Sequence, residues 1–180
     1  MFQCKVTDEI ELQLLQQSRA EALFALTDAN RDYLRQWLPW VDSTRSVADT
    51  ARFIASAIQQ YADNKGLIAC MWYRGALCGV IGHHALDRAN RSTSLGYWIG
   101  AAHQGKGIVT ACCRALVAHA FRELKLHRVE IRCAVQNHRS RAIPERLSFQ
   151  FEGVARQAEW LYDHFVDLAV YSLLRTDNQL

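Results

Sequence analysis

The chain has 180 residues, of which 50% are hydrophobic and 22% charged, so its composition excludes a disordered protein. Charged residues interrupt every apolar stretch before the roughly 20 residues that a membrane-spanning helix needs. The net charge is +3, yet residues 104–146 hold nine basic against three acidic residues, which favours a small anionic ligand over a long polyanion.

The N-terminal part predicts a strand followed by two helical segments. Residues 10–15 alternate between apolar and polar side chains, as a half-buried strand does. Ser18 and Glu21 form a capping-box pattern that predicts a helix start. Asn30 is expected to cap a second helical piece, which Pro39 ends.

The middle of the chain changes from helical to strand periodicity. Ser46 starts a further predicted helix, with apolar residues at helical spacing behind it. Residues 66–73 and 77–84, joined by a turn at Arg74-Gly75, predict a hairpin. Residues 93–99 predict a third strand in this region.

The C-terminal part predicts two helices and three strands. A long helix is expected over 108–124, a strand over 129–135 and a short helix over 141–147. Two further strands are expected over 152–161 and 165–174. The order of elements predicts an α/β (α+β) fold, as one domain over residues 1–180 around a mixed sheet.

The cysteine pattern favours a reducing compartment. No Cys-x-x-Cys pair occurs among the six cysteines, and the adjacent Cys112 and Cys113 cannot form an ordinary unstrained disulfide. The first 15 residues hold no apolar run of the length of a signal peptide. We therefore expect a cytoplasmic protein whose cysteines are mostly small buried hydrophobic residues.

A glycine-rich turn joins the strand over 93–99 to the long helix. Gly105 and Gly107 allow tight backbone curvature, and the unpaired N–H groups of the helix start attract anions. Lys106 adds a positive charge. The spacing fits neither a Walker A loop nor a dinucleotide fingerprint. We interpret the turn as a phosphate cradle, against the alternative of an ordinary glycine-rich connection.

This turn resembles the acyl-CoA motif of the GNAT superfamily of N-acetyltransferases, Gln/Arg-x-x-Gly-x-Gly/Ala. Gln104 and Gly107 match the motif, whereas Val109 stands where Gly or Ala is usual. The resemblance covers nearly the whole chain and is strongest to the RimJ/RimL-like branch, which acetylates ribosomal proteins. The segments that carry it are 96–98, 103–108, 133–140 and 157–161.

The resemblance implies an acetyl-CoA-dependent enzyme that acetylates the N-terminal α-amine of a protein by direct transfer in a ternary complex. The implied acceptor is a ribosomal protein that begins with serine. The family fold splays two parallel strands, here 93–99 and 129–135, around the pantetheine arm. The expected cofactor-binding residues are Trp98, Ile99, Gly100, Gln104, Gly105, Lys106, Gly107, Ile108, Val109, Thr110, Asn137 and Arg139.

Two residues are expected to move protons. Glu159 matches the proposed water-mediated base of RimL-like enzymes, and Ser140 matches the hydroxyl proposed to protonate the CoA thiolate. Without the resemblance, the sequence predicts that Glu159 is a solvent-facing carboxylate and that Ser140 caps a helix. Relatives often carry a glutamate two residues before Gly96, where this chain has Ser94.

Several other residues have both a functional and a structural interpretation. Cys133 offers a covalent route, but its apolar strand favours a packing role near the CoA sulfur. His83 and His84 face opposite sides of a strand and make a poor metal pair, so no metal is expected. Residues 37–40 either pack in the core or wall the acceptor cleft. Ser148 replaces a usual glycine at a helix end, at a modest cost.

Two other functions stay open at this point. The chain could acetylate a small amine, such as a polyamine or an antibiotic, or bind CoA without catalysis. Relatives of the branch are often dimeric, so a homodimer is one expected partner. No membrane or nucleic-acid partner is expected, because the basic segment lacks the surface aromatics of a recognisable nucleic-acid module.

Overall fold

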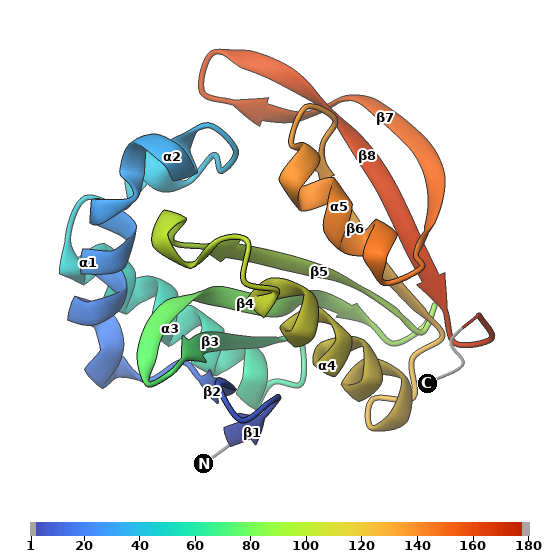
Figure 1. Cartoon of the computed structure of the whole chain (residues 1–180), viewed down its shortest axis with the longest axis horizontal. Coiled ribbons are helices and arrows are strands. Elements are labelled where there is room, and N and C mark those ends of the chain that lie inside the picture. Colours follow the sequence, from blue (N-terminus) through green and yellow to red (C-terminus); the bar gives the residue numbers. More distant parts are fainter. Residues whose placement is uncertain (1–2, 178–180) are drawn as a thin grey trace.

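The computed structural model describes residues 3–177, and the other five residues of the chain lie outside it. Within this range the strands form one sheet of order β1-β2-β3-β4-β5-β6-β8-β7 (Figure 1). They are β1 (Gln3–Lys5), β2 (Ile10–Leu14), β3 (Leu67–Tyr73), β4 (Ala76–Asp87), β5 (Ser92–Ile99), β6 (Arg128–Ala134), β7 (Gln150–Leu161) and β8 (His164–Leu174).

Helices cover both faces of this sheet. They are α1 (Ala20–Ala29), α2 (Arg31–Arg35), α3 (Val47–Ala62), α4 (Ile108–Arg122) and α5 (His138–Arg146), with 3-10 turns at Gln17–Arg19, Val41–Ser43 and Ala101–His103. None of the helices between residues 3 and 177 is long and apolar enough to cross a membrane. Because β5 and β6 pair in parallel and the other neighbours antiparallel, the predicted mixed α/β sheet is confirmed.

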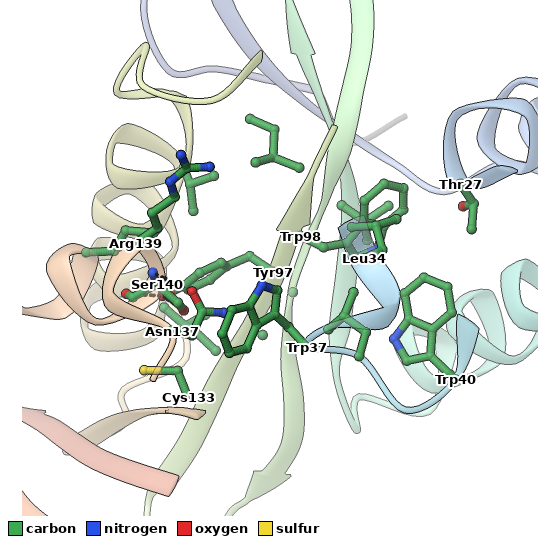
Figure 2. A pocket seen from close by; sticks show the side chains of 18 of the residues that line it. Thr27, Leu34, Trp37, Trp40, Tyr97, Trp98, Cys133, Asn137, Arg139 and Ser140 are labelled. Carbon is green, nitrogen blue, oxygen red and sulfur yellow. Dashed lines mark hydrogen bonds between the residues drawn. The ribbon is translucent and has the colours of Figure 1, made fainter. Parts of the chain in front are cut away.

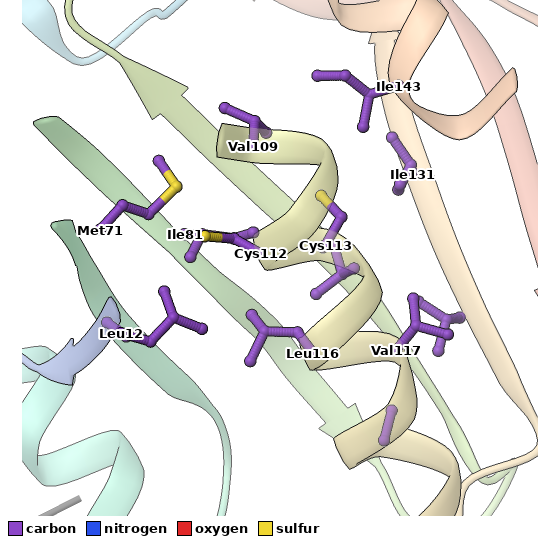
Figure 3. Close-up of a cluster of buried hydrophobic side chains, with 14 of the residues drawn as sticks. Leu12, Met71, Ile81, Val109, Cys112, Cys113, Leu116, Val117, Ile131 and Ile143 are labelled. Atoms are coloured by element: carbon purple, nitrogen blue, oxygen red, sulfur yellow. The ribbon is translucent and has the colours of Figure 1, made fainter. Parts of the chain in front are cut away.

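The two faces of the sheet bury separate apolar clusters. Leu23 of α1 and Ile54 of α3 pack on one face, against Val80 of β4. On the other face α4 lies along the sheet and buries Cys112 and Leu116 (Figure 3). Since side chains alternate along a strand, each strand of the centre contributes to both clusters.

Two of the predicted helix starts differ in detail. Ser46 caps α3 as expected, because its hydroxyl accepts the N–H of Asp49. Ser18 does not cap α1, since it lies inside a 3-10 turn that runs directly into the helix. Asn30 precedes α2 without a side-chain cap, and its Oδ1 accepts the N–H of Ala101 instead, 2.8 Å away. A long-range contact therefore replaces the local one.

Three further boundaries bear on the prediction. β1 (Gln3–Lys5) was not expected, since three residues are too few to show a period. α5 begins at His138, three residues earlier than predicted, because Asn137 caps it by accepting the N–H of Ser140. Ser148 has a φ of 60°, so the left-handed residue expected after this helix is confirmed.

A buried histidine lies between the sheet and α4. His83 of β4 is fully buried and its ring stacks on that of His119, with the ring centroids 5.8 Å apart. Burial lowers the pKa of His83 from 6.5 to about 3, and the neighbouring His119 adds to this effect. His83 is therefore neutral in the folded protein at neutral pH.

We expect the protein to lose stability as the pH falls from 7 towards 4. The unfolded chain protonates His83 near pH 6.5 but the folded protein only near pH 3, so the unfolded state binds more protons in between. His83→Phe keeps a ring and removes this titration, so its melting temperature should fall less over the same pH range. His127→Phe, at an exposed histidine, is the matched control; identical pH dependence of His83→Phe and the unaltered protein would contradict the assignment.

Candidate functional site

The parallel strands at the centre of the sheet separate along their length. β5 and β6 pair from Ser92 with Arg128 as far as Leu95 with Ile131. Both strands then continue, β5 to Ile99 and β6 to Ala134, without further pairing between them. The edge of β5 beyond Leu95 therefore faces an opening in the sheet, as the resemblance implied.

This opening belongs to a cavity of about 1560 Å³ that reaches both faces of the sheet. Figure 2 shows Ser140 and Asn137 of the α5 region on one side of β5, and Trp40 on the other. A cavity of this size holds a large cofactor arm together with part of a second molecule.

The glycine-rich turn forms one end of the cavity. Gly105 and Gly107 have φ values of 71° and 73°, in the left-handed region that favours glycine. A Cβ at either position would meet no atom within 4 Å, so backbone conformation and not space requires glycine here. Gly107 directly precedes α4, so the turn presents the helix N-terminus to the cavity. Val109, which departs from the motif, packs into the core (Figure 3).

Three elements meet at the mouth beside this turn. Arg139 of α5 donates from Nη1 to Oε1 of Gln104, 2.6 Å away. Burial raises the pKa of Tyr33 of α2, and the charge of Arg139 and a hydrogen bond with Gln104 oppose the rise. Arg141, also on α5, makes different contacts. It donates to Tyr171 and to the carbonyl of Val135.

A hydroxyl pair lies where the strands part. Ser140 Oγ donates to Tyr97 Oη and Tyr97 Oη donates to the Ser140 carbonyl, each over 3.2 Å. Burial raises the pKa of Tyr97 well above 10, so its phenol stays protonated. The sequence offered Ser140 as a helix cap, but Asn137 is the cap, and the Ser140 hydroxyl binds Tyr97 instead.

Cys133 of β6 lines the same part of the cavity and is buried. Burial raises the pKa of its thiol above 9, although Ser140 and Arg141 oppose the rise. A thiol with a raised pKa is a weak nucleophile at neutral pH, which agrees with the packing role predicted for Cys133.

A bulge in the C-terminal hairpin aims Glu159 into the cavity. β7 and β8 lose register between Ala155 and Glu159, where Gln157 adopts a φ of 50° and its N–H binds Asp167. Burial raises the pKa of Glu159 above 4.5. The carboxylate is thus more basic than an ordinary glutamate.

The wall opposite α5 is aromatic. Residues 37–40, which the sequence placed either in the core or on a cleft, line the cavity, and the rings of Trp40 and Trp98 lie 6.0 Å apart. The tip of the β7–β8 hairpin reaches this wall, because Tyr162 donates to the carbonyl of Leu38 and Arg35 stacks on the Tyr162 ring at 4.0 Å.

The predicted site residues come together in this one cavity, with one exception. Gly100 does not line it: its N–H binds the Cys78 carbonyl behind the turn. The sequence missed Tyr97 and His84, which also line the cavity, and three arginines. These are Arg114, Arg132 and Arg146. Arg114 lies about one helical turn after Thr110, so helical periodicity could have identified it.

The sequence comparisons all find acetyltransferases. The family model described as acetyltransferase (GNAT) domain matches residues 9–150. A Bacillus subtilis (strain 168) protein named "Putative ribosomal N-acetyltransferase YdaF" is 45% identical over 179 residues, covering 98% of this chain and 97% of that protein. The Escherichia coli (strain K12) ribosomal-protein-serine acetyltransferase is 29% identical over 168 residues, covering 93% and 94%.

Solved structures agree with this similarity. RimL, a ribosomal L7/L12 alpha-N-protein acetyltransferase in complex with coenzyme A, has a TM-score of 0.94 and 26% identity, covering 98% of this chain and all of that one. The microcin C7 self-immunity acetyltransferase MccE, in complex with acetyl-CoA and AMP, has a TM-score of 0.90 and 32% identity, covering 94% of each chain.

Proposed function

The chain belongs to the acetyltransferase (GNAT) family, and we propose that it transfers the acetyl group of acetyl-CoA to the N-terminal α-amine of a ribosomal protein, one that begins with serine. As a family member it is an N-acetyltransferase. The observation that carries the proposal is a single cavity that joins an opened strand pair, a glycine turn at a helix N-terminus, a carboxylate and a hydroxyl.

The glycine turn suits the pyrophosphate of acetyl-CoA. The amides at the start of α4 point their positive ends at the cavity, and Lys106 and Arg114 add positive charge. Arg139 already reaches across to Gln104 and can turn to a phosphate. In this role the turn residues would bind the phosphates, and the free edge of β5 from Gly96 to Ile99 would hydrogen-bond the pantetheine arm.

The proton steps would use groups on both sides of the opened strands. The neutral amine attacks the thioester carbon, the C–N bond forms, and the C–S bond breaks. Glu159 takes the proton that the new amide nitrogen loses, directly or through water. Ser140 protonates the thiolate when its hydroxyl turns from Tyr97 towards the sulfur. Tyr97 can then donate a hydrogen bond to the deprotonated Ser140 oxygen. This oxygen regains a proton when Glu159 releases its own to solvent.

The acceptor would approach from the aromatic wall. Residues 37–40 line the cavity, and a slender chain end such as an unfolded N-terminus would lie along this wall. A small amine is the second candidate. It is favoured by the 32% identity to an immunity acetyltransferase whose structure holds AMP, above the 26% identity to RimL.

The acceptor is tested by acetyl-CoA turnover on three substrates. We expect acetylation of a serine-starting peptide from the host's own ribosomal stalk protein, and none of the same peptide with a blocked N-terminus. Polyamines and amine-bearing nucleotides form the third group. Turnover only in that group would overturn the protein acceptor, and binding of CoA without any turnover would support a non-catalytic module.

Glu159→Gln should lower kcat about 100-fold, because general-base catalysis contributes at least that much. CoA affinity, measured by calorimetry, should not change. In the unaltered protein kcat should fall as the pH drops through the raised pKa of Glu159, since only the carboxylate accepts a proton. Glu21→Gln, at an exposed glutamate of α1, is the control. Normal kcat in Glu159→Gln would refute this role.

Gly107→Ala should weaken CoA binding at least several-fold. The left-handed φ costs alanine about 1 kcal/mol, and relaxing it would turn the first amides of α4 away from the phosphates. Gly75→Ala is the matched control, because Gly75 has a φ of 77° in a hairpin turn outside the cavity. Both variants should lose similar stability in urea. Equal CoA affinity in the two would count against the phosphate cradle.

A further inference from the structure

An imidazole on β4 remains outside the mechanism described so far. His84 follows the buried His83 and therefore points to the opposite face of the sheet, the one that α1 and α3 cover. Its cross-strand partner is Ser94 of β5. His84 lines the large cavity and is exposed there, although His83 is fully buried.

The ring of His84 lies directly over the backbone of Gly96. A Cβ on Gly96 would overlap Nε2 of His84 and lie 2.7 and 2.9 Å from its Cδ2 and Cε1. The φ of Gly96 is not positive, so the conformation of the strand does not require glycine. Glycine is required at position 96 because the imidazole ring of His84 occupies the space that a Cβ would need.

This position lies where the parallel strands part. Gly96 is the residue after Leu95, whose pairing with Ile131 is the last between β5 and β6. Gly82 pairs with Gly96 across β4 and β5. The His84 ring fills the space beside Gly96, and Ile68 fills the space beside Gly82. The imidazole therefore lines the cavity next to the gap between the strands.

The imidazole is held neutral. The surrounding protein lowers the pKa of His84 below 6.5 by desolvation. Asp49 and Arg52 of α3, Glu159 of β7 and Arg132 of β6 also line the cavity, and His83 lies on the other face of the strand. Since no hydrogen bond between His84 nitrogens and the described residues is formed, the ring is available to accept one from a ligand.

We propose that His84 is a catalytic residue that removes the first proton from the acceptor amine. This inference rests on the proposed function. An α-amine has a pKa of roughly 7.7–8.0, so it enters mainly as ammonium at neutral pH. His84 takes one proton, which leaves the nitrogen lone pair free to attack, and passes it to solvent. Glu159 takes the second proton after the C–N bond has formed.

Two proton acceptors in the cavity suit the proton balance of the reaction. The ammonium loses two protons to become an amide N–H, and the departing thiolate gains one from Ser140. One proton is released to solvent overall. A single carboxylate would have to release its first proton before it could accept the second. With two acceptors, His84 and Glu159 each accept one proton.

His84→Gln tests the proposal through the pH dependence of kcat/KM for the peptide. We expect kcat/KM to fall about 10-fold or more at pH 6.5 and less than 3-fold at pH 9, where the amine is already neutral. The KM for acetyl-CoA should not change. Gly96→Ala should give the same pH dependence of kcat/KM for the peptide, because its Cβ displaces the ring without removing it.

His127→Gln, at an exposed histidine outside the cavity, should keep the full activity and serves as the control. A loss in His84→Gln that is the same at every pH, or no loss at all, would overturn the assignment while the proposed function stands. If the unaltered protein acetylates no amine at any pH, the proposed function fails and this inference fails with it.

Discussion

The loss of pairing between β5 and β6 after Leu95 and Ile131 is the constraint on which the rest of the site depends. Backbone N–H and C=O groups need hydrogen-bond partners, and a strand edge inside a protein must find them in water or in a ligand. The separation places such an edge inside a cavity, between two helical layers. The glycine turn and the start of α4 follow β5 along the chain, so the glycine-rich end of the cavity and the open edge are continuous.

The elements around the gap are held to one another by contacts between distant segments. Arg139 joins α5 to the glycine turn, Tyr162 joins the C-terminal hairpin to residue Leu38, and Arg141 joins α5 to β8 through Tyr171. These contacts keep the two sides of the cavity at a set separation. One side of the cavity is rich in arginine side chains and backbone amides, and the other side is rich in aromatic rings. The first side therefore suits an anionic ligand, and the second side suits an apolar one.

Much of the site could be predicted because its signals are local in the chain. Gly105 and Gly107 lie three residues or fewer from the helix that they precede, and both have the left-handed φ that only glycine adopts easily. Glu159 and Ser140 were identified by a resemblance, and the fold brings both to the cavity. Tyr97 could not be identified, since its partner Ser140 lies 43 residues away and strand periodicity predicts only that Tyr97 is partly buried.

The sequence alone determined the order of the helices and strands after the short β1, the cap at Ser46, and the turn that starts α4. Each of these follows from residues a few positions apart, whose hydrogen bonds and side-chain periods are set within one segment. Only the tertiary structure decided that Asn30 binds the backbone of Ala101 and that the His84 ring rests on Gly96. Such contacts depend on strand register and on how strands diverge, and no local pattern in the chain encodes them.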